Sequence, residues 1–201
     1  MRTKNLEKEK AIRTIAMQII AEEGLENLSM QKLAKAANIS PRTIYIKYKD
    51  KEDLLIKLFI EAVLGPYEEA VLKGFNPEMD FAEGVKRIWL NTFCYLKNNP
   101  HAFALIKHGK SSPMLQKAYR ENNISEGDFF LPVQIFLKSN KKKGIIPNYP
   151  HEVHRAILFA PIAELVNEYF DNVSRPKQII TEKILMLCCD VVIKGILNKI
   201  S

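Results

Sequence analysis

The chain has 201 residues, 47% of them hydrophobic and 26% charged, with only eight glycines and a formal net charge of +7. This composition favours helices and supplies enough apolar side chains for a substantial core, and it excludes a strongly acidic protein. No apolar run is long enough to span a membrane, and the opening MRTKNLEKEK lacks the apolar segment of a signal peptide, so we expect a cytoplasmic protein with no membrane partner.

Positive charge is concentrated near the N-terminus. Residues 1–51 contain 11 Lys and Arg residues against 6 Asp and Glu residues, whereas residues 52–201 contain 19 against 17. A local excess of this kind is typical of a surface that binds nucleic-acid phosphates. The alternative is a merely basic surface that is solvated.

The first predicted helix runs from about Asn5 to Glu23, because apolar residues recur there at helical spacing and Gly24 follows. Two short helices joined by a tight turn are predicted in the next stretch, SMQKLAKAANISPRTIYIKY, which starts at Ser29. Its serines are good N-caps, and Pro41 suits the first position of the second short helix. Asn38 tolerates the left-handed conformation that such a turn requires.

This pattern predicts a helix-turn-helix whose second helix enters a DNA major groove. Ile39 and Ile44 are expected to face inward. The side chains left outside carry charge, hydroxyl groups and an aromatic ring, which suit phosphates and base edges.

The segment ISPRTIYIKYKDKEDLL resembles the signature of the tetracycline-repressor (TetR) family, T-[LI]-Y-x-[HKY]-[FY] followed by x-[SD]-K-E-[DE]-L. The preceding LSMQKLAKAANIS is similar to that family's first motif helix and turn. The resemblance covers about the first quarter of the chain. Two departures occur: Asn38 replaces the usual Gly, and Pro41-Arg42 replaces the frequent Lys-Gly pair, so base preference cannot be transferred.

The resemblance implies an all-α fold, with a three-helix DNA-binding head at residues 1–48 and a larger effector-binding and dimerisation body at residues 49–201. We expect Tyr45, Lys47 and Lys51 to contact phosphates, and Arg42 and Thr43 to reach base edges. The complete candidate set for DNA binding is Ser29, Ser40, Arg42, Thr43, Tyr45, Lys47, Tyr48 and Lys51.

One long helix is predicted to link head and body. Asp50 is its expected N-cap, and Gly65-Pro66 should kink or break it. Further helices are predicted near residues 80–98, 100–110, 125–144, 151–172 and 176–200, and Ser112-Pro113 is expected to start another segment over residues 114–122. In the 125–144 helix, Ser125 is the expected cap and Pro132 a possible kink.

The last two helices are apolar around most of their circumference, so they should be buried on more than one side. One side is expected to face the core of the body and the other a second copy of the chain. The resemblance points the same way, since TetR family members typically dimerise through their last two helices as a four-helix bundle.

Aromatic residues recur along the predicted body helices. They are either plain core or the lining of a cavity for an apolar ligand, as helical bundles often have. The candidates for ligand binding are Trp89, Phe93, Phe103, Phe129, Phe136 and Phe159.

The sequence offers little support for a metal site, a redox centre or a catalytic site. His151 and His154 share a helical face but lack further metal ligands, so no metal or cofactor is expected. The three cysteines, Cys94, Cys188 and Cys189, have apolar neighbours and should be buried thiols, with a redox sensor as the alternative. No nucleophile, phosphate-loop or dinucleotide motif is present.

The sequence therefore predicts a homodimeric transcriptional regulator, not an enzyme. We expect a repressor released from a palindromic operator in double-stranded DNA by a small apolar or amphipathic effector. One alternative is a DNA-binding regulator controlled by a protein partner with no small-molecule effector. The other is a small all-α enzyme with an incidental helix-turn-helix.

Overall fold

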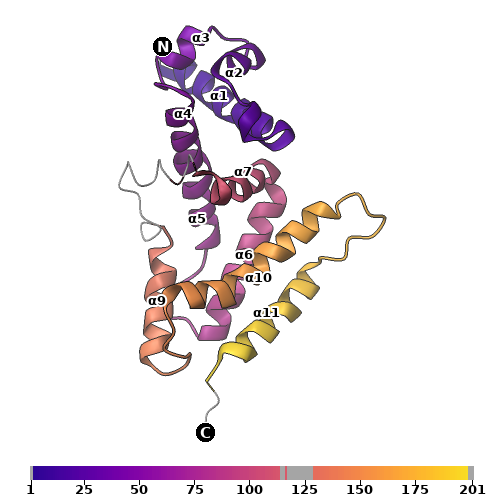
Figure 1. The fold of residues 1–201 in the computed structure, drawn as a ribbon. Coiled ribbons are helices and arrows are strands. Elements are labelled where there is room, and N and C mark those ends of the chain that lie inside the picture. The colour runs from indigo at the N-terminus through magenta and orange to yellow at the C-terminus, as the bar shows by residue number, and fades with distance from the viewer. Residues whose placement is uncertain (1, 114–115, 117–128, 199–201) are drawn as a thin grey trace. The chain divides into compact units, whose positions relative to one another are not determined.

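A computed structural model shows an all-helical chain, as predicted (Figure 1). The structure describes residues 2–113, 116 and 129–198, and it contains no strand within them. The described residues form two compact units. The first unit contains residues 2–66 together with the described residues from 99 to 116, and the second contains residues 67–98 and 129–198.

The first unit is built from short helices around one long helix. Its elements are α1 (Arg2–Glu23), the 3₁₀ turn η1 (Leu25–Asn27), α2 (Met30–Ala36), α3 (Pro41–Tyr45), α4 (Lys51–Lys57), the π-helical segment η2 (Leu58–Leu64) and α7 (Pro100–Ser111). α1 packs against α2, η1, η2 and α7, and α2 packs against α3.

The core of this unit follows the apolar spacing of the sequence. Ile12, Ala16 and Ile20 lie four residues apart on α1 and are all fully buried. Leu33 of α2 and Ile44 of α3 are fully buried as well. Burying an aliphatic side chain of this size contributes about 1.5–3 kcal/mol. This burial, rather than the intrinsic stability of two such short helices, holds α2 and α3 in place.

The Gly65-Pro66 pair does not break the helix that follows Asp50. α4 leads into η2, and α5 (Gly65–Val71) continues from it. Gly65 keeps helical angles, with φ −59° and ψ −57°, and its N–H donates to Ile60 O, five residues earlier. A proline ring crowds the preceding turn of an α-helix, and the wider π turn relieves this crowding. The predicted break is therefore wrong.

The second unit is organised around α6 (Phe81–Asn98), which packs against α10 (His151–Asp171) and α11 (Glu182–Ile196). The side chains expected on the apolar side of α6 are all buried: Phe81, Val85, Ile88, Trp89, Thr92, Phe93 and Leu96. The indole N–H of Trp89 donates to the Leu158 carbonyl of α10 at 2.8 Å. That bond satisfies the one polar group of a side chain with no exposed surface.

Two helices of this unit begin later than the sequence pattern predicted. α9 (Leu131–Lys142) has Pro132 in its first turn, where a proline is tolerated, so no kink occurs. The expected cap, Ser125, lies outside the described residues. α11 begins at Glu182 rather than near residue 176, because the Thr181 hydroxyl accepts from the Ile184 N–H at 3.3 Å and caps the helix there.

α6 and α9 meet through a close aromatic contact. The Phe136 ring stacks on Phe81, with centroids 5.7 Å apart, and meets Phe75 edge-on at 5.3 Å. Gly84 of α6 lies directly under Phe136, because a Cβ there would come within 2.6 Å of the ring carbon Cζ. Only glycine leaves room for this packing.

The change Gly84→Ala should destabilise the protein by about 1–3 kcal/mol, because an added methyl overpacks a filled core. The control is Gly65→Ala on α5, a helical glycine where a Cβ would come no closer than 3.6 Å to its nearest neighbour, the Ile60 carbonyl oxygen. Replacing that helical glycine should stabilise the protein by up to about 1 kcal/mol. Urea unfolding at fixed protomer concentration measures both. A Gly84→Ala protein as stable as the native one would contradict the observed approach of α6 to α9.

Candidate nucleic-acid interface

The turn between α2 and α3 has the geometry that the sequence predicted. Ser29 caps α2 by accepting from the Lys32 N–H at 3.1 Å. Asn38 lies in the left-handed region with φ 52°, and the Ile39 N–H returns to the Ala34 carbonyl at 3.0 Å. This bond closes the end of α2 and redirects the chain into α3.

The start of α3 is fixed by a capping serine side chain and by a proline ring. The Ser40 hydroxyl oxygen accepts from the Thr43 N–H at 3.3 Å, and the two hydroxyl groups lie 2.9 Å apart. Pro41 occupies the first turn. Ser40 and Ser29 therefore act as caps in this structure, and Thr43 shares its hydroxyl with one of them.

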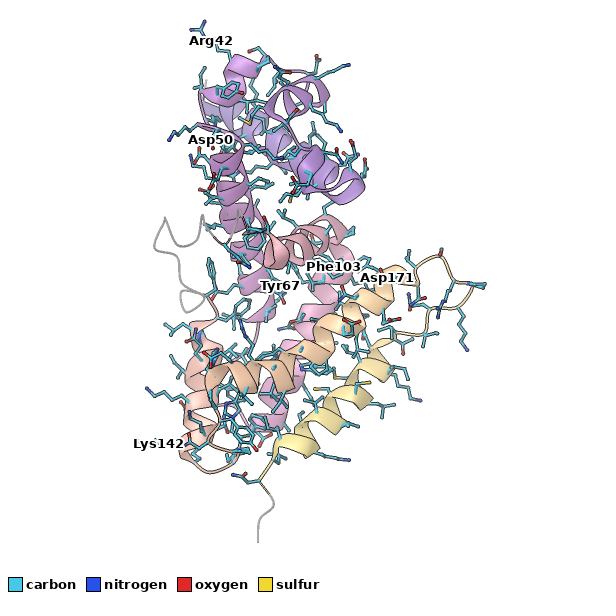
Figure 2. All side chains as sticks on the ribbon, viewed as in Figure 1. Arg42, Asp50, Tyr67, Phe103, Lys142 and Asp171 are labelled. Atoms are coloured by element: carbon cyan, nitrogen blue, oxygen red, sulfur yellow. The ribbon has the colours of Figure 1, made fainter. Side chains whose placement is uncertain are left out.

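The outer face of α3 is open. Arg42 is exposed and points away from the helices of the first unit (Figure 2). Tyr45 is 52% exposed, and Ile46, which follows the helix, is 77% exposed. Ile46 was missed by the sequence reasoning, because an isolated isoleucine next to a motif looks like a core residue. A cation, a phenol and an apolar side chain thus share one exposed surface.

Tyr48 lies on the opposite side, in the core of the first unit. It is only 2% exposed, and the Lys57 ammonium lies 5.7 Å from its ring centroid. Burial leaves its ring no surface for a ligand, so we exclude Tyr48 from the interface and assign it to packing. The aromatic pair of the motif is therefore divided, with Tyr45 outside and Tyr48 inside.

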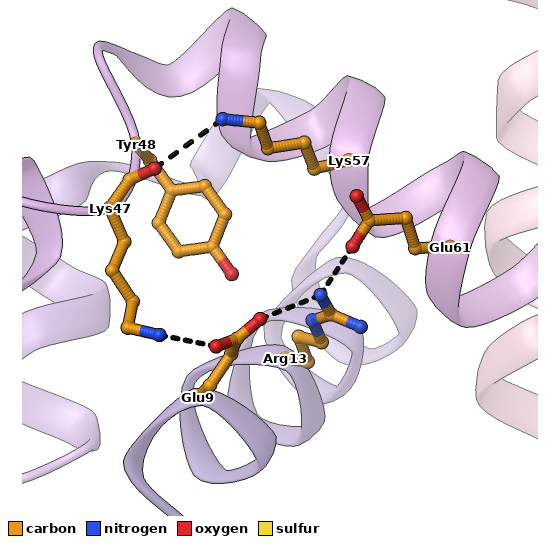
Figure 3. A pocket seen from close by; sticks show the side chains of 6 residues that line it. All are labelled: Glu9, Arg13, Lys47, Tyr48, Lys57 and Glu61. Carbon is orange, nitrogen blue, oxygen red and sulfur yellow. Dashed lines mark hydrogen bonds and ion pairs between the residues drawn. The ribbon is translucent and has the colours of Figure 1, made fainter. Parts of the chain in front are cut away.

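Lys47 belongs to a network of ion pairs that joins α1, the end of α3 and η2 (Figure 3). Its ammonium is paired with Glu9 of α1. Arg13 donates to the other oxygen of Glu9 at 2.8 Å, and the same Arg13 nitrogen is paired with Glu61 of η2. With Tyr48 and Lys57, these residues line a pocket of about 200 Å³.

The ion-pair network shifts the pKa of the Glu9 carboxyl group. The hydrogen bond from Lys47, helped by Arg13, holds the pKa of Glu9 below its ordinary value against the opposing effect of burial. Glu9 is therefore ionised near neutral pH. In this structure the Lys47 charge is neutralised within the protein.

The start of α4 is capped by two aspartates. Asp50 accepts from the Asp53 N–H at 2.8 Å, and Asp53 accepts from the Lys49 N–H at 2.9 Å. Burial raises the pKa of Asp53, but bonds from Lys57 and the Lys49 N–H outweigh it and leave that pKa below its ordinary value. Lys51 extends from this helix start, with its ammonium 3.4 Å from the Glu26 carbonyl.

The aromatic candidates for ligand binding divide into two groups. Trp89, Phe93 and Phe136 are at most 1% exposed and make up the centre of the second unit. Phe129 and Phe159 are half-buried in the same unit, whereas Phe103 is half-buried in the first. Five of the six candidates therefore belong to the second unit and one, Phe103, to the first.

A second aromatic cluster was not anticipated from the sequence. The Tyr67 ring packs against Tyr95 and Phe130, with centroids 5.6 and 5.5 Å apart. Burial raises the pKa of Tyr67, although a hydrogen bond with Thr92 opposes the shift. Phe130 has φ 57°, and its N–H donates to the Glu68 carboxylate. A bulky residue in the left-handed region is strained, which often marks a functional site.

One histidine and one cysteine of the second unit are buried and have structural rather than chemical roles. His154 is 2% exposed and bonds to the Pro147 carbonyl at 2.9 Å. Burial raises the pKa of the Cys189 thiol to about 12, so this thiol is unreactive. The described ranges contain no cluster of three metal-ligating residues, and none of their helices is long and apolar enough to cross a membrane.

Known proteins resemble this chain both in the helix-turn-helix motif and in the whole fold. The family model "Bacterial regulatory proteins, tetR family" matches residues 12–58. A TetR family transcription regulator from Marinobacter aquaeolei VT8 has a solved structure with a TM-score of 0.78 and 26% identity, covering 99% of this chain and all of its own. Residues 12–58 carry the TetR family DNA-binding motif, and the chain has the fold of a TetR family regulator.

Two further relatives extend this TetR family assignment. An uncharacterized HTH-type transcriptional regulator of Haemophilus influenzae is 36% identical over 95 residues, covering 47% of this chain. The match spans half the length of that protein. The transcriptional regulator FadR of Bacillus subtilis, solved in complex with stearoyl-CoA, is similar in fold, with a TM-score of 0.70 and 24% identity over 96% of this chain and all of its own.

The turn geometry gives a prediction for Asn38. The change Asn38→Ala should lower the free energy of unfolding by about 1 kcal/mol, because alanine lacks the short polar side chain that lets asparagine adopt the left-handed conformation at lower cost. The matched change Asn38→Gly should leave stability equal or higher, because glycine takes φ 52° without strain. Chemical unfolding of the two variants compares them. Equal stabilities would mean that the turn does not depend on a left-handed residue.

Proposed function

We propose that this TetR family chain is a DNA-binding transcriptional regulator that represses by occupying a palindromic operator. The observation that carries the proposal is the outer face of α3. There Arg42, Tyr45 and Ile46 are exposed on a short helix fixed by a serine cap and a proline. α3 has the length and exposed chemistry of a helix that reads the major groove.

Each exposed side chain has a role in this proposal. Arg42 hydrogen-bonds a base edge, and guanine is its best partner because it offers two acceptors. Ile46 contacts a thymine methyl group, which is the apolar feature of the groove. Tyr45 and Lys51 bind phosphates and set the position of the helix on the duplex. Thr43 reaches a base edge only if its hydroxyl leaves Ser40.

The proposed division of labour places DNA recognition in residues 1–48, with dimerisation and effector binding in residues 49–201. The compact units divide at a different point, because α4 and η2 belong to the same unit as α1, α2 and α3. The helices after residue 48 thus serve both as support for the head and as its link to the rest of the chain.

Binding to DNA should be steeply salt-dependent and selective. The logarithm of the affinity should fall by about 0.9 per phosphate contact for each tenfold increase in salt. Tyr45→Ala should weaken binding to all sequences, whereas Arg42→Ala and Ile46→Ala should change the preferred bases, at about 1–3 kcal/mol per base pair. Selection from a random duplex library, followed by salt titrations, measures both effects.

The control for this experiment is Lys138→Ala, which removes an exposed charge from α9 in the second unit. It should leave both affinity and preference unchanged. Failure of the native protein to bind duplex DNA at low salt contradicts the proposed function. An unchanged selected sequence for Arg42→Ala removes that residue from base reading.

We propose that the protein is a two-fold dimer through α10 and α11, which pack side by side (Figure 1). α11 carries Ile184, Leu187 and Val191 at helical spacing, exposed by 37%, 52% and 70%. α10 adds exposed Val153 and Ile157. A stripe of apolar residues on the outer side of helices that already bury another face supports a partner helix pair.

The change Leu187→Glu should weaken dimerisation by at least about tenfold, because a carboxylate in a dry interface loses its hydration without a partner. The matched control is Val173→Glu, which places the same charge on an exposed apolar residue between α10 and α11. Sedimentation equilibrium at several concentrations measures both. A monomeric native protein, or equal effects of the two changes, contradicts the proposed interface.

We also propose an apolar or amphipathic effector that binds the second unit and releases DNA. The support is the aromatic content of that unit, including the strained Phe130 beside Tyr67. Half-buried Phe129 and Phe159 are the retained candidates for the lining. Long-chain acyl-CoA is the first ligand to test, because the FadR relative was solved with stearoyl-CoA. A regulator controlled by a protein partner remains the second candidate.

Stearoyl-CoA should lower the affinity for the selected operator, and the operator should lower the affinity for stearoyl-CoA by the same factor. Fluorescence titrations in both directions measure the two factors, with CoA and stearate separately as controls. A tight complex with stearoyl-CoA that leaves operator affinity unchanged would favour the partner-controlled candidate.

A further inference from the structure

The ion-pair network of Figure 3 has a consequence for Lys47. Lys47 follows the last residue of α3 by two positions, and the sequence predicts that it contacts a phosphate. In this structure the ammonium is instead paired with the Glu9 carboxylate, and the side chain is only 22% exposed. The Lys47 carbonyl is also held, by the Lys57 ammonium at 3.4 Å. Because this pairing neutralises the Lys47 charge and occupies one of its three N–H donors, a phosphate binds Lys47 more weakly while Glu9 holds it.

We propose that Glu9 competes with DNA phosphate for Lys47 and so lowers the basal affinity for DNA. This inference rests on the proposed DNA-binding function. A carboxylate and a phosphate offer the same kind of acceptor to an ammonium group. Glu9 acts as an internal substitute for phosphate, and docking of the head on DNA weakens the Lys47–Glu9 pair.

Arg13 sets how strongly Glu9 holds Lys47. Arg13 divides its charge between Glu9 and Glu61, since one guanidinium nitrogen is paired with both carboxylates. Its Nε is buried and has no hydrogen-bond partner among the described residues. An arginine can bind one carboxylate through two parallel bonds, whereas Arg13 makes a single bond to Glu9 and also hydrogen-bonds the Tyr48 side chain. When Arg13 turns fully to Glu9, less of the Glu9 charge remains for Lys47.

Glu61 makes this competition adjustable. It lies on η2, the π-helical segment directly before Gly65-Pro66, from which the chain continues into the second unit. Withdrawal of Glu61 from Arg13 transfers Arg13 to Glu9 and frees Lys47. Return of Glu61 restores the Lys47–Glu9 pair. The order of contacts, Glu61 to Arg13 to Glu9 to Lys47, connects the position of η2 to the charge available beside α3.

The test is a double-mutant cycle on binding to a 20-base-pair duplex of random sequence. Glu9→Gln should raise the affinity of the native chain about two- to fivefold at low salt, the range set by one partly exposed ion pair. In a Lys47→Met background the same change should have a smaller effect, because the competed group is absent. The gain should shrink as salt rises, because screening weakens a partly exposed pair.

Two controls separate competition from general charge effects. Glu7→Gln removes the same charge from an exposed position on α1, two residues away, and should change affinity less than Glu9→Gln does. Glu61→Gln should raise affinity in the native background but not in Glu9→Gln, because it acts through Arg13 and Glu9. Circular dichroism and thermal unfolding confirm that each variant is folded.

The outcomes are distinct. If Glu9→Gln lowers affinity, Glu9 positions Lys47 for DNA, and the proposed competition is wrong. If Glu9→Gln and Glu7→Gln act equally, or if Lys47→Met does not reduce the effect, the influence is long-range charge and the inference is again overturned. If the native protein binds no duplex at any salt concentration, the proposed function itself fails and this inference fails with it.

Discussion

The proposed interface depends on the burial of Ile44 and Tyr48. These two residues lie four positions apart, so both point into the core of the first unit, where they are at most 2% exposed. Their burial fixes the rotation of α3 about its own axis. Once that rotation is set, Arg42, Tyr45 and Ile46 must face outward. A five-residue helix is too short to be stable alone, so tertiary packing rather than helix propensity gives the reading surface its shape.

The same packing controls the electrostatics of the head. The positive charge counted in the sequence is larger than the charge available to a ligand, because Lys47 and Arg13 are paired with Glu9 and Glu61. Lys57 is similarly paired with Asp53 at 2.9 Å. Arg42 carries the exposed charge at the tip of the motif. Charge counting therefore points to the first 51 residues, while the ion pairs show which of their cations are neutralised within the protein.

The second unit shows how an apolar sequence pattern leads to more than one outcome. Trp89, Phe93 and Phe136 were candidates for a ligand site, and all three are buried in the core. The stripe on α11, from Ile184 to Val191, was equally apolar in sequence and is exposed. Hydrophobic periodicity reports that a face avoids water, but the same pattern serves a core, a ligand or a partner chain.

Local structure was determined by the sequence itself. The caps at Ser29, Ser40 and Asp50, the left-handed turn at Asn38 and the buried face of α6 depend on neighbours within a few residues, so short-range chemistry was sufficient to predict them. The continuity of the helix through Gly65-Pro66 was not predictable in this way, because a π turn opened the space that proline needs.

Only the tertiary structure decided which motif residues are available. Tyr45 and Tyr48 were both candidates for DNA contact, yet one is 52% exposed and the other 2%. The pairing of Lys47 with Glu9 joins residues 38 positions apart, and that of Arg13 with Glu61 joins residues 48 apart. Such distances along the chain carry no periodic signal. These contacts arise because the buried faces of α1, α2 and η2 pack together and bring distant charges within bonding distance.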